Sequence, residues 1–245
     1  MTIKTTTCGA ALACALLLSA ACDSDDGAAT PPADLMEAGP YAVGFSSHTI
    51  TYQPVGVAGE RSLEVSVWYP AVAGSGTPTT HAVAGIIEVE RPAVLTDATP
   101  VPAADLADGA TFPVLAYSHG NGGVGLVAYS YGEHFASWGW VVVSPDHTGN
   151  TILDGGNAFL LSSLYRPQDL SAVLDWLEDG VPAPLAGRTD DRILAAGHSF
   201  GAFTVLSMAG AIGKWTANDT QCVGVAEGDD DGSCALLADS TSRSV

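Results

Sequence analysis

The chain of 245 residues carries 27 acidic and only 8 basic side chains, a formal net charge of −19 at pH 7, and 47% of its residues are hydrophobic. A surface this negative repels phosphate backbones, which excludes nucleic acid as a partner. The apolar content argues against a disordered chain, and no stretch after residue 22 is apolar over a length that could span a bilayer. We therefore expect a globular protein with a sizeable core.

The first 21 residues have the pattern of a bacterial signal peptide, with an apolar run from Ala10 to Leu18 followed by small residues. Residues 18–22 resemble a lipobox, in which Cys22 becomes lipidated, although the leucine stands one position earlier than preferred. A plain signal peptide cut near Ala21, with an incidental Cys22, is the alternative. Both interpretations predict export from a bacterial cytoplasm, as a membrane-anchored lipoprotein or as a periplasmic or secreted protein. Any contact with a membrane is then made through the N-terminal lipid.

Residues 22–38 are predicted to form an acidic tether, because they are polar, contain prolines and show no hydrophobic periodicity. The folded domain then covers residues 39–245. Its body contains two cysteines, Cys222 and Cys234. In an oxidising compartment they are candidates for a disulfide, and a pair of unpaired thiols is the alternative that their spacing leaves open.

The first part of the domain contains two segments that alternate apolar with polar residues, 47–52 and 63–69. This period of two predicts strands at an antiparallel edge. Residues 72–111 are rich in glycine, proline, alanine and threonine, and we expect an irregular insertion there, without a function.

From Phe112 onward, predicted strands and helices alternate along the chain. Strands are predicted over 112–117, 140–143 and 192–196, and helices over 129–138, over 167–178 and from Phe200. Pro167 suits the first turn of the second of these helices. The alternation predicts a parallel sheet with helices on both faces, in which ligands bind at the carboxyl ends of the strands.

The strongest chemical motif is Gly197-His198-Ser199-Phe200-Gly201, a G-x-S-x-G sequence between a predicted strand and a predicted helix. The glycines allow a tight turn and close packing of the helix, so the serine is expected to be strained, with its hydroxyl exposed. Ser199 is the candidate nucleophile. Backbone N–H groups at the helix start would face a developing oxyanion. A helix start of small residues without chemistry is the alternative.

A glycine-rich turn, residues 118–123, follows the strand that begins at Phe112. Such a turn can present a backbone N–H to a ligand. An ester hydrolase needs two donors aimed at one oxygen, and removing one typically costs about 10²- to 10³-fold in turnover. The candidate oxyanion donors are the backbone N–H groups of Asn121 and Phe200.

Five separate segments, in this order along residues 39–211, resemble the α/β-hydrolase superfamily, in particular its dienelactone-hydrolase-like group with platelet-activating-factor acetylhydrolases and bacterial polyester hydrolases, some of them lipoproteins. The segments are Val67-Trp68-Tyr69-Pro70, Ser118-His119-Gly120-Asn121, 145–151, 166–170 and 197–201. The resemblance implies an α/β-hydrolase fold, Ser199 as nucleophile and Asn121 and Phe200 as oxyanion donors. It also implies hydrolysis of carboxylic esters, small or polymeric, without a cofactor.

The sequence departs from this resemblance at the acid and the base. In the family they follow the serine, Asp first and then His, yet all six histidines precede or adjoin Ser199: His48, His81, His119, His134, His147 and His198. Residues 200–245 are too few for the rest of a hydrolase sheet. We therefore expect a C-terminally incomplete and nearly inactive hydrolase whose acid and base lie beyond Val245.

Two of these histidines are candidates to line the site, His119 and His147. For His119 the favoured interpretation is that it fixes the glycine turn through hydrogen bonds. His147 follows a strand that, in the sheet order implied by the resemblance, does not neighbour the strand of Ser199.

Two other functions stay open. Gly120 to Gly125 fits G-x-G-x-x-G after a strand, with Asp146 at the end of the next strand, which is a dinucleotide-binding pattern. Export from the cytoplasm argues against it. A non-catalytic lipoprotein could keep the scaffold for binding. The acidic run 227–231 lacks the alternating ligands of a calcium loop, so no metal is predicted. The sequence makes no prediction of the ester substrate or the oligomeric state.

Overall fold

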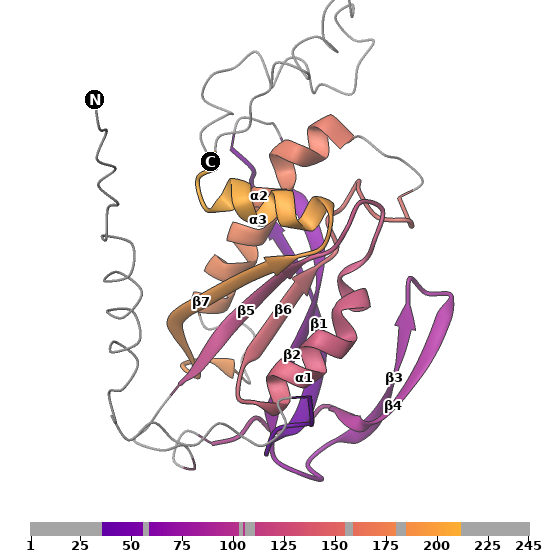
Figure 1. Ribbon diagram of the computed structural model, residues 1–245, viewed down its shortest axis with the longest axis vertical. Coiled ribbons are helices and arrows are strands. Elements are labelled where there is room, and N and C mark those ends of the chain that lie inside the picture. Colours follow the sequence, from indigo (N-terminus) through magenta and orange to yellow (C-terminus); the bar gives the residue numbers. More distant parts are fainter. Residues whose placement is uncertain are drawn as a thin grey trace, which may run out of the picture. The chain divides into compact units, whose positions relative to one another are not determined.

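The computed structural model describes residues 36–55, 59–102, 105, 111–154, 159–179 and 185–211 (Figure 1). These residues belong almost entirely to the second of two compact units, Ala38–Val245. The predicted signal peptide, nearly all of the tether, Cys22, Cys222, Cys234 and the expected C-terminal shortfall lie outside the described residues. Among the described helices, none combines the length and the apolar character needed to cross a membrane.

The described residues form a seven-stranded sheet in the order β3-β4-β1-β2-β6-β5-β7. The strands are β1 (Ala42–Tyr52), β2 (Arg61–Ala71), β3 (Thr77–Val83), β4 (Ile87–Thr96), β5 (Phe112–Ser118), β6 (Val141–Pro145) and β7 (Thr189–Gly197). β5 pairs in parallel with β6 and β7, and β1 with β4, whereas the other neighbours are antiparallel. The sheet is therefore mixed, and its parallel β6-β5-β7 part carries the ends at which a ligand is expected.

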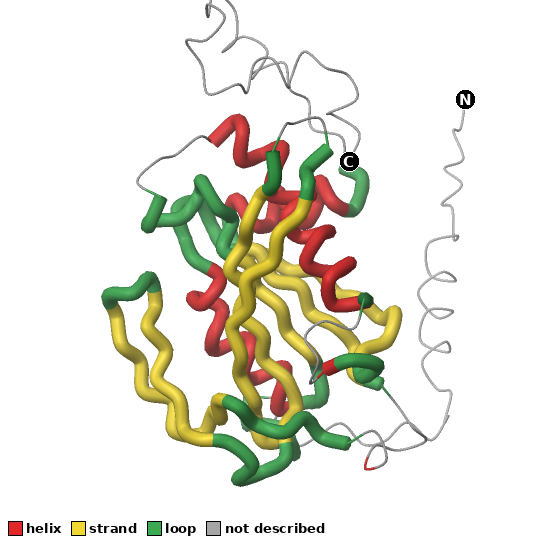
Figure 2. The backbone as a smooth tube through the Cα atoms, turned by 180° about the vertical axis from the view of Figure 1, so that it is seen from behind, coloured by secondary structure: helices red, strands yellow, loops and turns green. Residues whose placement is uncertain are grey.

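Helices cover both faces of the sheet (Figures 1 and 2). They are α1 (Tyr129–Ser137), α2 (Phe159–Glu178) and α3 (Phe200–Met208), with a short 3₁₀ helix over Gly125–Ala128. Successive residues of a strand point to opposite faces, so Val67 joins the cluster that α2 and α3 cover, whereas the adjacent Trp68 joins the cluster under α1. This three-layer arrangement confirms the predicted α/β-hydrolase fold class.

The segment predicted as an irregular insertion instead forms the β3–β4 hairpin, so the β1–β2 pair is antiparallel but does not lie at the sheet edge. The hairpin turns at Ala84 and Gly85, with φ of 51° and 67°, and the N–H of Ile86 donates to the carbonyl of Val83. Val83 pairs with Ile87, so three residues form the loop, two of them at positive φ as tight hairpin turns require. Alanine in place of the usual asparagine or glycine concealed this turn in the sequence.

Helix α2 also differs from its prediction. It begins at Phe159 rather than at Pro167, which therefore lies inside the helix. Proline has no N–H to donate, so the helix passes this point with one backbone hydrogen bond fewer. The longer helix places Arg166 within the regular part of α2, fully buried.

The packing of α1 on the sheet leads to a first prediction. Gly132 lies in the helix, where alanine would normally stabilise by about 1 kcal/mol, but a Cβ at this position would lie 2.3 Å from the indole of the fully buried Trp68. We expect Gly132→Ala to destabilise the protein by about 1–3 kcal/mol, the usual cost of overpacking. Urea denaturation measures this free energy of unfolding. Ser130→Ala, at an exposed position of the same helix, should be neutral or stabilising, and equal effects of the two substitutions would contradict the prediction.

Candidate active site

The turn between β7 and α3 holds Ser199 in a strained backbone conformation. Its φ of 53° and ψ of −116° lie in a region that residues other than glycine rarely adopt. The residue is exposed and precedes the first residue of α3, and its side chain makes no capping hydrogen bond. The hydroxyl is therefore accessible to a substrate at the start of a helix.

The two glycines of the motif are required by close contacts. A Cβ at Gly197 would lie 2.4 Å from the carbonyl oxygen of Gly201, and a Cβ at Gly201 would lie 1.9 Å from the carbonyl oxygen of Ser118. Both distances are far shorter than van der Waals contact. The first turn of α3 thus packs directly against the end of β5 and against Gly197, the last residue of β7.

The glycine-rich turn after β5 lies against Ser199. A Cβ at Gly120 would be 3.0 Å from Nδ1 of His198 and 3.6 Å from the Cβ of Ser199. The two candidate oxyanion donors therefore come from segments that meet at Ser199: Asn121 from this turn and Phe200 from the start of α3. The side chain of Asn121 is engaged separately, since its Oδ1 accepts a hydrogen bond from Asn150 Nδ2 at 2.9 Å.

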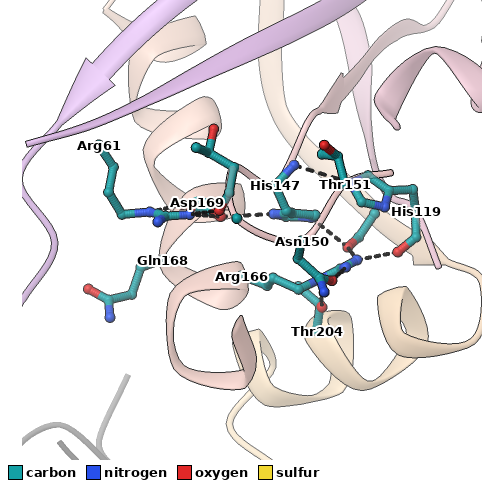
Figure 3. A network of polar contacts seen from close by, with 12 residues as sticks. Arg61, His119, His147, Asn150, Thr151, Arg166, Gln168, Asp169 and Thr204 are labelled. Atoms are coloured by element: carbon teal, nitrogen blue, oxygen red, sulfur yellow. Dashed lines mark hydrogen bonds and ion pairs between the residues drawn. The ribbon is translucent and has the colours of Figure 1, made fainter. Parts of the chain in front are cut away.

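His119 is buried behind the turn and does not line an open site (Figure 3). Its Nε2 accepts a hydrogen bond from the backbone N–H of His147 at 3.1 Å, so Nδ1 carries the proton and donates to the carbonyl of Gly120 at 2.7 Å. Burial, aided by the neighbouring His147 and Arg166, lowers the pKa of His119 to about 2. A neutral imidazole held on both sides stabilises the turn.

His147 is the centre of a buried chain of hydrogen bonds (Figure 3). Its Nδ1 lies 3.0 Å from Oδ2 of Asp169 and its Nε2 lies 2.9 Å from Oγ of Ser118. Burial lowers the pKa of His147 to about 4. Burial alone would raise the pKa of Asp169, but hydrogen bonds from His147 and Arg61 outweigh it and keep that pKa below its ordinary value. The neutral imidazole therefore donates a hydrogen bond from Nδ1 to the carboxylate and accepts one at Nε2 from the Ser118 hydroxyl.

This Ser118–His147–Asp169 arrangement has the connectivity of a catalytic triad but no access for a substrate. All three side chains are fully buried. The Ser118 oxygen also accepts a hydrogen bond from Arg166 Nη2 at 3.0 Å, which occupies a lone pair that a nucleophile would need. Neither feature is compatible with attack on an ester, so Ser118 is a structural serine.

The motif reasoning missed Arg166, Asp169 and Asn150 as individual site residues. They were visible only as members of segments that carry the family resemblance. Their signal was weak, because Arg166 and Asp169 stand three residues apart on one face of a helix, which is the pattern of a solvent-exposed ion pair. Here that polar face is buried instead.

No imidazole serves Ser199 in the described contacts. All six histidines are within the described residues, and none of their side chains makes a hydrogen bond with the Ser199 hydroxyl. His198 is exposed and adjoins the serine, and its backbone N–H donates to the Ser118 carbonyl at 3.2 Å. His147 follows β6, which is separated from β7 by β5, as the sequence predicted.

The structure does not favour the dinucleotide-binding alternative. The residue expected to reach a ribose, Asp146, instead accepts a hydrogen bond from the backbone N–H of Gly125 at 2.5 Å. The turn also leads into a 3₁₀ helix over Gly125–Ala128 rather than directly into an α-helix. Asp146 therefore fixes the glycine turn, and the long helix N-terminus that binds pyrophosphate in such proteins does not follow it.

Comparison with solved structures gives distant neighbours. A ferulic acid esterase from Streptomyces cinnamoneus is 22% identical with a TM-score of 0.48, over 74% of this chain and 57% of that one. A cold-adapted esterase from an Arctic intertidal metagenomic library is 15% identical (TM-score 0.39, 67% and 55%), and an acylaminoacyl peptidase from Pyrococcus horikoshii is 13% identical (0.38, 69% and 21%). The chain thus spans little more than half the length of either esterase. No family model and no curated protein matches it.

The neutral state of His147 leads to a second prediction. Its pKa is about 4 in the folded protein and near its ordinary value of 6.5 in the unfolded chain. Protons therefore bind the unfolded chain first, and the free energy of unfolding should fall as the pH decreases from about 6.5 to 4, by about 3 kcal/mol for this group. Urea denaturation across this interval measures the loss. His147→Gln should make the slope smaller by the share of this one group, while His119, whose pKa is lowered to about 2, continues to contribute. A slope equal to that of the unaltered protein would refute the assignment.

Proposed function

We propose that this protein is a serine hydrolase that cleaves carboxylic esters through an acyl-enzyme on Ser199. The observation that carries the proposal is the exposed serine at a φ of 53°, between two glycines that leave no room for a side chain, with the Gly120 turn against it. A non-glycine residue in this conformation costs of order 1–3 kcal/mol, and such strain concentrates at functional sites.

The proposed reaction begins with attack of the Ser199 hydroxyl on the ester carbonyl. The carbonyl oxygen becomes an oxyanion, which we expect the backbone N–H groups of Phe200 and Asn121 to stabilise. The carbonyl of Ser199 accepts hydrogen bonds from Ala202 and Phe203 at 3.0 and 3.4 Å, so it points along α3. Because the peptide is planar and trans, the Phe200 N–H points the opposite way, out of the helix start. The bond to the leaving oxygen breaks, and that oxygen takes up the proton that Ser199 lost, so an alcohol departs. Water then attacks the acyl-enzyme, which releases a carboxylic acid and returns a proton to the Ser199 oxygen.

No described imidazole bonds to Ser199, so we expect residues 1–245 by themselves to react slowly. Loss of the base in a serine hydrolase costs about 10⁶ in turnover and leaves roughly 10³ to 10⁴ over water. The proposal keeps the export inferred from the leader, either as a lipoprotein anchored at Cys22 or as a periplasmic or secreted protein. It also keeps a small or polymeric ester as partner, which the family resemblance implies. The second candidate function is a binding scaffold without catalysis, which the missing contact between Ser199 and an imidazole favours.

A third prediction separates these two functions. A fluorophosphonate should label Ser199 slowly, and added imidazole should accelerate the labelling with saturation, because a soluble base can replace the missing one at an accessible hydroxyl. Mass spectrometry of the intact protein and of its peptides measures the rate and the site. The Ser199→Ala variant should not be labelled at all.

Two control variants sharpen this experiment. Ser207→Ala changes a partly exposed serine of the same helix and should label like the unaltered protein. Ser118→Ala removes the buried serine of the Ser118–His147–Asp169 arrangement and should leave a labelled Ser199. Labelling at Ser118, or none at Ser199 at any imidazole concentration, would reject the hydrolase and leave the binding scaffold.

A further inference from the structure

Arg166 is a buried cation whose direct partners are all neutral. Its side chain is fully buried in α2, and its three nitrogens donate to oxygens of Thr204, Asn150, Ser118 and His119. Burial lowers its pKa to about 10, still well above neutral pH, so the guanidinium stays charged. A buried charge is tolerated only when its donors are satisfied, which makes each of these contacts part of one unit.

The partners of Arg166 come from α3, from the loop after β6 and from the end of β5 (Figure 3). Nε donates to Thr204 Oγ1 on α3 at 3.1 Å, and the guanidinium lies 4.6 Å from the ring centre of Phe200. Nη1 donates at 2.6 Å to Asn150, whose amide in turn donates to the side chain of Asn121. Nη2 donates to the carbonyl of His119, the residue just before the Gly120 turn. One side chain thus links α3, the loop after β6 and the turn after β5.

The Ser118–His147–Asp169 chain orients the oxygen that Arg166 meets. Asp169 fixes the proton of His147 on Nδ1, so Nε2 accepts a hydrogen bond from the Ser118 hydroxyl. The Ser118 hydroxyl hydrogen therefore points away from Arg166, and its lone pair faces Nη2. Arg61 neutralises Asp169 from the other side, with Nε 3.0 Å from Oδ1. The Ser118–His147–Asp169 chain therefore holds the orientation of the Ser118 hydroxyl.

His119 connects this unit to the candidate oxyanion donor. Its Nδ1–H donates to the carbonyl of Gly120 at 2.7 Å, and the N–H of Gly123 donates to the same oxygen at 3.0 Å. That carbonyl belongs to the peptide whose N–H is the amide of Asn121. In a planar trans peptide the C=O and N–H point in opposite directions, so fixing one fixes the other. His119 therefore sets the direction of the Asn121 N–H.

We propose that His119 and Arg166 are positioning residues that aim the backbone N–H of Asn121 at the oxyanion formed on Ser199. Arg166 fixes the backbone carbonyl of His119. The backbone N–H of His147 holds Nε2 of the His119 ring, and Nδ1 of the same ring fixes the peptide between Gly120 and Asn121. The inference rests on the proposed hydrolase function. It assigns His119 a task that is distinct from proton transfer, for which its buried and neutral ring is unsuited.

A matched pair of substitutions tests this role in the full chain. His119→Asn keeps an N–H donor near the position of Nδ1, whereas His119→Leu has a similar size and no donor. We expect His119→Leu to lower the saturating rate of fluorophosphonate labelling at Ser199, in imidazole, by about 10- to 100-fold, part of the full cost of an oxyanion donor. The half-saturating concentration should change little, and His119→Asn should recover most of the rate. Arg166→Met should behave like His119→Leu, and the exposed Arg192→Met should be silent.

Amide hydrogen exchange provides a readout that does not depend on activity. In His119→Leu and Arg166→Met, exchange of the amides of residues 120–123 should accelerate about tenfold or more, while the amides of the β3–β4 hairpin keep their rates. A slower labelling that His119→Asn does not recover, or exchange at 120–123 that stays unchanged, overturns the positioning role. If the unaltered protein is not labelled at all while exchange still accelerates, the hydrolase function and the aim at an oxyanion both fail, and only the ordering of the turn survives.

Discussion

The contact between the first turn of α3 and the end of β5 is the constraint on which the candidate site depends. At Gly201 the helix backbone comes so close to the Ser118 carbonyl that no side chain fits between them. The chain must therefore reverse within the two residues between β7 and α3, and the second of them, Ser199, has a positive φ. The same carbonyl accepts the N–H of His198. The strain at Ser199 is thus a consequence of packing, and the packing also brings the Gly120 turn against the serine.

The polar network beneath this contact is stable only when each of its buried charges has hydrogen-bonding partners. Arg166, His147 and Asp169 lie fully buried between α2 and the sheet, where an unpaired charge would be very costly. Each is satisfied by partners from other segments, and removing one partner of a buried ion typically costs 3–5 kcal/mol. Because the partners come from β2, β5, the loop after β6 and α3, the network ties together segments that hydrophobic packing alone would hold with less specificity. A directional network suits a site in which single N–H groups must point at one atom.

Much of the fold could be predicted from local patterns, and the exceptions have physical causes. β5, β6 and the start of α3 were predicted within one or two residues, because their apolar runs end in glycine or proline. The β3–β4 hairpin was missed because Ala84 occupies a turn position that normally reveals itself by glycine or asparagine. The length of α2 was missed because Pro167 marks a helix start in most sequences, whereas the packing of this helix accommodates it internally.

The candidate site likewise contains residues that local motifs predict and residues that only tertiary contacts bring together. The G-x-S-x-G turn and the glycine turn are local motifs, so sequence reasoning placed Ser199, Asn121 and Phe200 on segments that the structure brings together. The buried relay joins Ser118, His147 and Asp169 from three distant segments, and no spacing rule connects them. Its charged members on α2 carry the same residue pattern as an exposed helix face, so only tertiary contacts reveal that the face is buried.

The two serines show why hydrogen-bond geometry alone does not identify a nucleophile. The Ser118 hydroxyl lies 2.9 Å from the imidazole of His147, which lies 3.0 Å from the carboxylate of Asp169. Ser118 is nevertheless buried, and its oxygen accepts a hydrogen bond from Arg166. Ser199 has the exposure, the strained backbone and two neighbouring amides, yet no described imidazole bonds to it. A nucleophile needs an open lone pair and space for the carbonyl that it attacks before it needs a base, because a base can be supplied from elsewhere and access cannot. By this criterion Ser199 is the better candidate for the proposed chemistry, and in our proposal the Ser118 relay holds Arg166 and the turn that Arg166 fixes.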